Sequence, residues 1–196
     1  MELKLPSVSE LNSLEFIDLF PYILWHENRK YFDLPCGTEH YRLLAYMSLQ
    51  LPKGQTILDV GTYLGMSAVA LAYNRTCTVK SFDLVNHFGN QLVNPTHRSN
   101  ISFQQENILE KLPEYLINCS FILLDTNHDG EFEHTFFEAL LKNNFQGVLI
   151  LDDIHLNEAM KSFWNSISLK KIDITHIGHW SGTGAVIFNE KKVNLI

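Results

Sequence analysis

The chain has 196 residues, 45% of them hydrophobic, which is enough apolar material for one sizeable core and short for two domains. Its 22 acidic residues outnumber its 15 Lys and Arg residues and give a formal charge of −7. This balance leaves no basic surface for a phosphate backbone or anionic lipid, so we expect no nucleic-acid partner and no membrane partner.

The amino-terminal part of the chain predicts helices. We expect a single domain over residues 1–196, in which residues 1–35 form an accessory helical segment and residues 36–196 form the core. Ser7 and Glu10 have the spacing of a capping box, which indicates the start of an amphipathic helix. A second helical pattern follows Thr38, because apolar residues recur on one face of it.

The rest of the chain alternates between apolar strands and helices. Strands are predicted at residues 55–60, 78–83, 101–104, 120–125 and 147–152, with two closing strands at 172–177 and 185–188. Helices are predicted at residues 65–73, 109–116, 131–142 and 157–167, and a substrate-facing loop at 84–100. This alternation predicts an α/β fold, a Rossmann-like doubly wound sheet of seven strands with helices on both faces. The sheet should be mostly parallel with the last strand antiparallel, because the final connection is too short for a parallel crossover.

Acidic side chains mark the ends of the predicted strands. Asp59, Asp83, Asp125 and Asp152 each stand at a carboxyl end, and Gly61 follows the first of them. In an open α/β sheet these ends share one edge, where ligands bind in a crevice. The sequence therefore predicts a ligand site at this edge.

Gly61 and Gly65 allow the backbone to approach a ligand closely where a strand turns into a helix. Asp83 lies 24 residues beyond Asp59, about the spacing at which an acid reaches ribose hydroxyls in nucleotide-binding folds. Tyr63 stands where a dinucleotide fingerprint needs a glycine, which favours a nucleoside ligand without a pyrophosphate. A glycine turn that only packs a helix on a strand is the alternative.

These motifs together resemble those of a known family. Asp59-Val-Gly-Thr-Tyr-Leu-Gly65, Asp83, Leu-Leu-Asp125-Thr-Asn-His128 and Gly147-Val-Leu-Ile-Leu-Asp-Asp153 are similar to class I S-adenosylmethionine-dependent methyltransferases. More narrowly, they resemble the small metal-dependent sugar and macrocin-type O-methyltransferases, over roughly residues 36–190. The resemblance implies S-adenosyl-L-methionine as cofactor and, as acceptor, a hydroxyl of a sugar, a glycan or a glycosylated small molecule.

The resemblance also implies which residues hold the cofactor. Gly61 and its neighbours would contact the methionine part, Asp83 the ribose hydroxyls, and Asn107 the adenine. The family usually has an acid in or beside the Asn107 position, although an amide can still hydrogen-bond the base. The full predicted cofactor set is Asp59, Gly61, Thr62, Tyr63, Gly65, Ser67, Asp83, Asn107 and Asp125.

Asp125, Asp152 and Asp153 bring three carboxylates to one crevice, an oxygen-rich set suited to a hard ion such as Mg²⁺, or to Mn²⁺. In the family that this chain resembles, such an ion holds the acceptor hydroxyl and lowers its pKa. The alternative is that Asp152 caps the next helix, Asp153 is solvated and Asp125 is only partly buried.

His128 is the predicted general base, because it follows Asp125 by three positions and an imidazole accepts a proton near neutral pH. Relatives with this spacing place the histidine near the acceptor hydroxyl. His155 is the reserve candidate. Asn127 stands where many relatives carry a second acid, so a base at that position is absent here.

Four further residues are candidates for the acceptor site. Glu39 and His40 begin the helix that precedes the first core strand, where relatives often contact cofactor or acceptor. His179 and Trp180 lie in the last turn, and a Trp ring offers a flat face on which a sugar can stack. A solvated helix start and a Trp that covers the sheet edge are the alternatives.

The sequence thus predicts a metal-assisted O-methyltransferase with a histidine base. Two alternatives stay open, a metal-independent N- or carboxyl-methyltransferase and a non-catalytic cofactor- or partner-binding module associated with glycan synthesis. A nicotinamide oxidoreductase is disfavoured, because the glycine fingerprint is absent. The sequence gives no indication of oligomeric state.

The cysteines and the apolar runs bear on location. Cys36, Cys77 and Cys119 are too far apart for a zinc site or a disulfide framework. The sequence shows no signal-peptide core and no apolar run of membrane-spanning length. We therefore expect a soluble, cytoplasmic protein with three reduced thiols.

Overall fold

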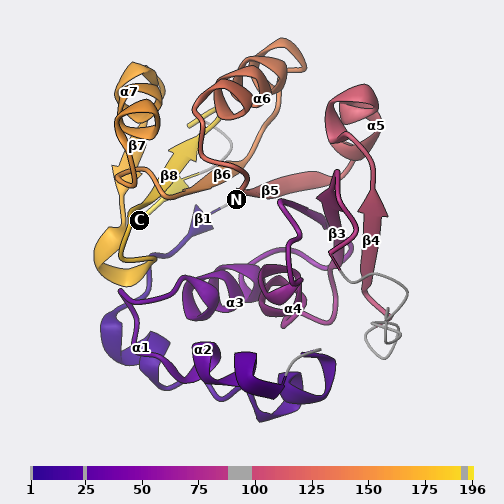
Figure 1. The fold of residues 1–196 in the computed structure, drawn as a ribbon, viewed down its shortest axis with the longest axis vertical. Coiled ribbons are helices and arrows are strands. Elements are labelled where there is room, and N and C mark those ends of the chain that lie inside the picture. The colour runs from indigo at the N-terminus through magenta and orange to yellow at the C-terminus, as the bar shows by residue number, and fades with distance from the viewer. Residues whose placement is uncertain (1, 24–25, 88–98, 191–193) are drawn as a thin grey trace.

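The computed structural model describes residues 2–23, 26–87, 99–190 and 194–196 (Figure 1). Most of the loop predicted at residues 84–100 lies outside these ranges. Within them, no helix is both long enough and apolar enough to cross a membrane. The three cysteines are free thiols, as predicted.

The centre of the described chain is a seven-stranded sheet in the order β4-β3-β2-β5-β6-β8-β7. Strands β4, β3, β2, β5 and β6 pair in parallel, whereas β8 is antiparallel to both β6 and β7. The predicted Rossmann-like sheet with an antiparallel last strand is therefore confirmed. The strands are β2 (Thr56–Val60), β3 (Thr78–Asp83), β4 (Ile101–Gln105), β5 (Cys119–Leu124), β6 (Val148–Asp152), β7 (Lys171–Asp173) and β8 (Thr183–Ile187).

Helices cover both faces of this sheet (Figure 1). Successive strand residues point to opposite faces, so Ile57 packs with α3 and α4 while Leu58 packs with α5, α6 and α7. Each layer of helices thus has its own apolar core against the sheet. The helices are α3 (Tyr41–Leu49), α4 (Met66–Leu71), α5 (Leu112–Tyr115), α6 (Glu131–Lys142) and α7 (Glu158–Ser166).

The amino-terminal segment packs against α3 and α4 on the side away from the sheet (Figure 1). It contains α1 (Val8–Asn12), two 3₁₀ turns (Ile17–Tyr22 and His26–Arg29) and α2 (Lys30–Asp33). The predicted capping box is present, because Ser7 N donates to Glu10 Oε2 (2.7 Å) and Glu10 N donates to Ser7 Oγ (3.3 Å).

A buried arginine ties this segment to the core. Arg42 of α3 donates hydrogen bonds to the backbone oxygens of Leu11 (3.0 Å), Leu14 (2.9 Å) and Leu34 (3.0 Å). At the other end of the segment, β1 (Glu2–Leu3) pairs in parallel with β9 (Asn194–Leu195), a small second sheet that the sequence did not predict.

Most element bounds differ from the predictions by one to three residues. The larger difference is the strand predicted at 172–177, which ends at Asp173 and continues as a 3₁₀ turn over Thr175–Ile177. Its cause is local, because the Asp173 carboxylate accepts hydrogen bonds from the backbone N–H (3.0 Å) and hydroxyl (2.5 Å) of Thr175. A side chain that bonds its own backbone two residues on favours a turn over a strand.

Gly61 allows β2 and β5 to end side by side at the ligand edge. Its φ is +107°, and a Cβ at this position would lie 1.5 Å from the backbone oxygen of Asp125. The carboxyl edge of the sheet therefore requires a residue without a side chain here.

We predict that Gly61→Ala lowers the unfolding free energy by more than about 3 kcal/mol, because it combines a left-handed backbone with a backbone clash. Gly54→Ala is the matched control, since Gly54 has φ +85° but nothing within 4 Å of its added Cβ. The control should lose only about 1–2 kcal/mol, the penalty for the left-handed conformation. Urea denaturation measures both, and equal losses would contradict the close approach.

Candidate active site

A cavity of about 490 Å³ lies at the carboxyl ends of β2, β3, β4 and β5. This volume is in the range of small-molecule sites. Five residues of the predicted cofactor set line it, together with the predicted base and two residues that the sequence did not assign: Gly61, Tyr63, Asp83, Asn107, Asp125, His128, Glu106 and Phe132.

The carboxylate of Asp83 is held in place at the end of β3. Its Oδ2 accepts from the backbone N–H of Tyr63 (3.0 Å), and its Oδ1 accepts from that of Val85 (3.0 Å). The ring of His87 lies 3.5 Å from Oδ2. Each carboxylate oxygen has further acceptor capacity, so Asp83 is oriented by the protein and still able to bind hydroxyl groups.

Asn107 and Glu106 lie together on the cavity wall after β4. Asn107 Oδ1 accepts from Leu109 N (3.1 Å) and so begins a 3₁₀ turn. Glu106, which the sequence reasoning did not assign, accepts hydrogen bonds from the Tyr115 hydroxyl and from Lys111 Nζ (3.0 Å). These bonds, that of Tyr115 first, lower the pKa of Glu106. The signal in the sequence that could have identified Glu106 is its position directly before Asn107, the predicted adenine contact.

The other predicted cofactor residues do not line the cavity. Asp59 is fully buried and accepts a hydrogen bond from Ser81 Oγ (2.6 Å), which also bonds Thr62 Oγ1 (2.7 Å). Burial raises the pKa of Asp59 to about 7, although hydrogen bonds from Ser81 and Ser67 act in the opposite direction. Gly65, with φ +74°, precedes α4. These residues hold the strand-to-helix turn beneath the cavity, and their direct contact with a cofactor stays a prediction.

The structure brings together the three carboxylates predicted as a metal site. Asp125 follows β5, while Asp152 and Asp153 lie at the end of β6. Imidazole rings lie between them. Asp125 Oδ1 is 3.4 Å from His128 Nε2, and Asp125 Oδ2 is 3.9 Å from His40 Nε2.

The same alternation continues around the other two acids. Asp152 Oδ1 is 3.1 Å from His40 Nδ1, and Asp152 Oδ2 is 3.2 Å from His179 Nδ1. Asp153 Oδ1 is 3.3 Å from His179 Nδ1, and Asp153 Oδ2 is 3.0 Å from His128 Nε2. The six side chains thus form a closed cycle of alternating acid and imidazole, here called the Asp–His ring: Asp125, His40, Asp152, His179, Asp153 and His128.

Charge within the Asp–His ring shifts its pKa values. Burial opposes protonation of His40 and His179, but the adjacent carboxylates, chiefly Asp152, outweigh it and raise their pKa values to about 9 and about 10. Although burial acts against it, the pKa of Asp152 is lowered by the same imidazoles. The pKa of Asp125 is raised, by burial first and by the charge of Asp152 second. Imidazolium charge thus offsets the repulsion among the acids.

Asp152 is not the cap of the following helix. The amino-terminal cap of α7 is Asn157, whose Oδ1 accepts from Met160 N (2.9 Å). Asp152 itself is 3% exposed and Asp153 is 7% exposed. The alternative of a capping Asp152 and a solvated Asp153 is therefore wrong, whereas its third part, a partly buried Asp125, agrees with a side chain that is 28% exposed.

His128 lies on both the cavity and the Asp–His ring, as Asp125 does. Its backbone has φ +56°, and its N–H donates to Glu133 Oε1 (3.1 Å) while its carbonyl accepts from Asn157 Nδ2 (2.9 Å). Buried Glu133 also accepts from Gly130 N (2.9 Å) and Thr126 Oγ1 (2.7 Å). Glu133 therefore positions the loop that carries the predicted base, a role that the sequence reasoning missed.

The remaining candidates lie around the Asp–His ring or away from it. Glu39 Oε2 is 3.8 Å from His179 Nε2, so Glu39 borders the ring. Trp180 is 67% exposed, with its ring centroid 5.7 Å from that of His179. His155 Nε2 instead contacts Asp173 Oδ2 (2.7 Å), outside the ring.

We predict that Asp59→Asn makes the unfolding free energy less dependent on pH. The folded-state pKa of about 7 exceeds the ordinary value of 3.8, so between these values the folded chain holds a proton that the unfolded chain has released. Wild-type stability therefore falls as pH rises through this window, by about 1.4 kcal/mol per pKa unit, and Asn removes the effect. Urea denaturation near pH 5 and near pH 8 measures the unfolding free energy of both proteins. Relative to wild type, the variant should be more stable at pH 8 than at pH 5. Parallel profiles would contradict it.

No protein-family model and no curated protein matches this sequence. Solved structures do match its fold. An O-methyltransferase from Bacillus cereus in complex with SAH is 16% identical, with a TM-score of 0.61 over 93% of this chain and 95% of that chain. A Corynebacterium glutamicum protein is 13% identical, with a TM-score of 0.64 over 92% of this chain and 93% of that chain.

Aeropyrum pernix fibrillarin with natively bound S-adenosyl-L-methionine is 14% identical, with a TM-score of 0.53 over 75% of each chain. At sequence identities this low, the structural similarity shows a shared fold alone. The chain therefore has the Rossmann-like fold of class I S-adenosylmethionine-dependent methyltransferases.

Proposed function

We propose that the protein is an S-adenosylmethionine-dependent O-methyltransferase that acts on a hydroxyl of a sugar, a glycan or a glycosylated small molecule with help from a divalent metal ion. The observation that carries the proposal is the junction of two features at one sheet edge. A cavity with an oriented acid, Asp83, meets the Asp–His ring at Asp125 and His128. The fold, shared with proteins solved with SAH and S-adenosyl-L-methionine, supports the same assignment.

The cavity residues suit a nucleoside cofactor. Asp83 would accept from the ribose hydroxyls, since its two oxygens are already aimed by backbone N–H groups. Asn107 and Glu106 would face the adenine, and Gly61 and Tyr63 the methionine part. The acidic Glu106 supplies the group that the family places in or beside the Asn107 position.

The chemistry left to the protein is alignment and proton removal. S-adenosylmethionine supplies a methyl group on a sulfonium, which is electrophilic without further activation. His128 Nε2, in its neutral form, would accept the proton of the acceptor hydroxyl as the new C–O bond forms and the S–C bond breaks. Asp125 and Asp153, at 3.4 and 3.0 Å from Nε2, would stabilise the imidazolium that results.

The face beside the Asp–His ring suits a sugar acceptor. Trp180 is 67% exposed and lies next to His179, so its ring is free to stack against an apolar sugar face. Glu39 adds a carboxylate acceptor near the same histidine. This combination of a flat aromatic surface and hydrogen-bonding acceptors supports a polyhydroxylated substrate.

One observation favours a second candidate, a methyltransferase that works without a metal on a nitrogen or carboxyl group. The three imidazoles of the Asp–His ring already offset the charge of its three acids. Retention of full activity after chelation of divalent ions would favour this candidate over the metal-assisted one.

We predict that S-adenosylhomocysteine binds the chain and that Asp83→Ala weakens this binding at least tenfold. Hydrogen bonds to a charged group contribute about 1.5–3 kcal/mol, which corresponds to roughly ten- to hundredfold in affinity. Asp173→Ala is the matched control, because Asp173 also ends a strand but does not line the cavity. Calorimetry with wild type and both variants measures this. No heat of binding at millimolar ligand would reject the cofactor assignment.

We further predict that His128→Gln lowers methyl transfer by about 10²–10⁴, the usual contribution of a general base, and leaves S-adenosylhomocysteine affinity within a few-fold of wild type. Turnover is measured as S-adenosylhomocysteine release with mixed sugars and glycans as acceptors. His134→Gln, on exposed α6 surface, is the control. If His155→Gln loses methyl transfer while His128→Gln retains it, His155 is the base.

A further inference from the structure

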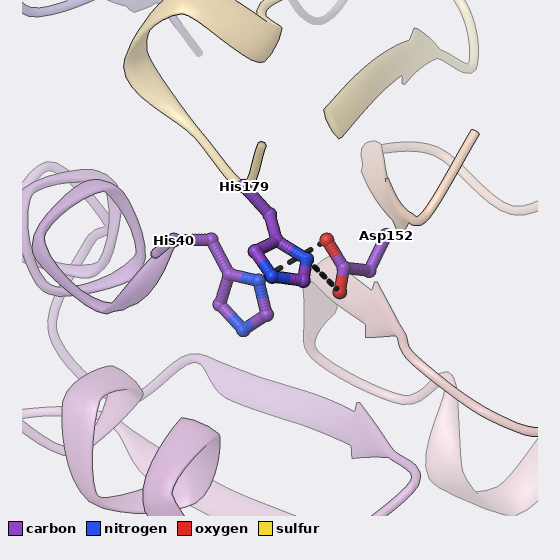
Figure 2. A group of neighbouring side chains, drawn as sticks. All are labelled: His40, Asp152 and His179. Carbon is purple, nitrogen blue, oxygen red and sulfur yellow. Dashed lines mark hydrogen bonds and ion pairs between the residues drawn. The ribbon is translucent and has the colours of Figure 1, made fainter. Parts of the chain in front are cut away.

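Within the Asp–His ring, four residues do not line the cavity, and three of them, His40, Asp152 and His179, form a compact trio. Figure 2 shows both imidazoles directed at the Asp152 carboxylate, one at each oxygen. They come from three separate parts of the chain, the start of α3, the end of β6 and the connection between β7 and β8. One ligand atom from each lies within 4.8 Å of the others.

Buried polar atoms in this trio lack hydrogen bonds. His40 is 3% exposed, yet neither of its ring nitrogens makes a hydrogen bond within the described chain, and Asp152 Oδ1 makes none either. His40 Nδ1 and Asp152 Oδ1 are 3.1 Å apart but are not aligned as donor and acceptor. Buried nitrogen and oxygen atoms are almost always hydrogen-bonded or bound to a cation, so these atoms call for a partner.

The spacing suits an ion. Two ligand atoms that each lie about 2.1 Å from one ion are at most about 4.2 Å from each other. The three ligand atoms here all lie within 4.8 Å of one another, so a small side-chain rotation brings them within this limit. His179 is the more exposed of the two histidines, with a side chain 17% exposed against 4% for His40, and its Nδ1 also lies 2.8 Å from Ser181 Oγ.

The outer nitrogens of the two imidazoles each face a second carboxylate, at a distance beyond that of a hydrogen bond. Both rings direct Nδ1 at Asp152, and both direct Nε2 at a second carboxylate: His40 at Asp125 Oδ2 (3.9 Å) and His179 at Glu39 Oε2 (3.8 Å). A ligating histidine typically gives its other N–H to a carboxylate, which fixes the tautomer and makes the ring a better ligand.

From this geometry we infer that His40, Asp152 and His179 bind a divalent first-row transition-metal ion. Two imidazole nitrogens and one carboxylate oxygen suit Zn²⁺, Co²⁺ or Fe²⁺, whereas Mg²⁺ prefers oxygen ligands in an octahedral set. This set differs from the all-aspartate ligand set expected from the sequence, because Asp125 and Asp153 become the groups that orient the ring around the ion. It deepens the proposed function, on which it rests for the use of the ion.

The test titrates the metal-free chain with Co²⁺ alone, without S-adenosylmethionine, and follows visible absorption and bound metal by equilibrium dialysis. We expect one ion per chain, absorption bands of a nitrogen-containing site, displacement by Zn²⁺ and no displacement by a large excess of Mg²⁺. His179→Gln and His40→Gln should each weaken Co²⁺ binding by at least about tenfold, since even changes outside the ligand set often have effects of that size.

Two comparison variants make the outcome decisive. His134→Gln should leave Co²⁺ binding unchanged, and Asp153→Asn should weaken it less than His179→Gln does. Equal competition by Mg²⁺, or loss of binding in Asp153→Asn with wild-type binding in both histidine variants, would overturn the assignment in favour of the all-aspartate set. Absence of stoichiometric Co²⁺ binding would also overturn it. Circular dichroism verifies folding, and His179→Gln decides if His40→Gln does not fold.

Calorimetry with S-adenosylhomocysteine on the same preparation separates this inference from the proposed function. Cofactor binding by a chain that binds no Co²⁺ overturns the metal site alone, while Co²⁺ binding without cofactor binding supports the site and rejects the methyltransferase.

Discussion

The repulsion among three carboxylates at the ends of two adjacent parallel strands is the constraint on which the rest of the site depends. Asp125, Asp152 and Asp153 are brought together by the pairing of β5 with β6, which the apolar sequences of these strands dictate. Like charges at this separation in a poorly solvated crevice are unfavourable by several kcal/mol unless positive groups are placed between them. Imidazoles from outside the two strands fill that requirement, and His40 and His179 therefore connect the helical layer and the final turn to the sheet edge.

The core strands, the strand-end acids and five of the residues that line the cavity could be predicted from sequence because each depends on short-range patterns. Apolar runs that end in Asp identify β2, β3, β5 and β6, and a parallel sheet places their ends together. The partners of those acids could not be predicted, because the chain has 9 histidines and nothing local distinguishes His40, before α3, from His134 on α6. Only the three-dimensional packing of α3 against the sheet selects it. The pairing of β1 with β9, between opposite ends of the chain, escaped prediction for the same reason.

The sheet edge divides the proposed chemistry between two regions that share a boundary. The cavity side has an oriented acid and a glycine turn that suit a nucleoside, and the Asp–His ring has the groups that suit a hydroxyl and an ion. Asp125 and His128 belong to both. A methyl donor and an acceptor bound on the two sides would meet at these residues, which is the geometric requirement for direct transfer.

The backbone of the site is strained, and this has a consequence for how its sequence can vary. In the described chain six residues other than glycine have positive φ, a conformation that Asn, Asp and His adopt more readily than other residues with a side chain, and three of the six are asparagines. The other three are Tyr63, His128 and Asp153, with φ of +41°, +56° and +58°, and all lie on the cavity or the Asp–His ring. Such positions are each unfavourable by about 1–3 kcal/mol. Glycine at any of them would relieve the backbone and remove a side chain that belongs to the proposed site, so selection for stability alone would erode that site.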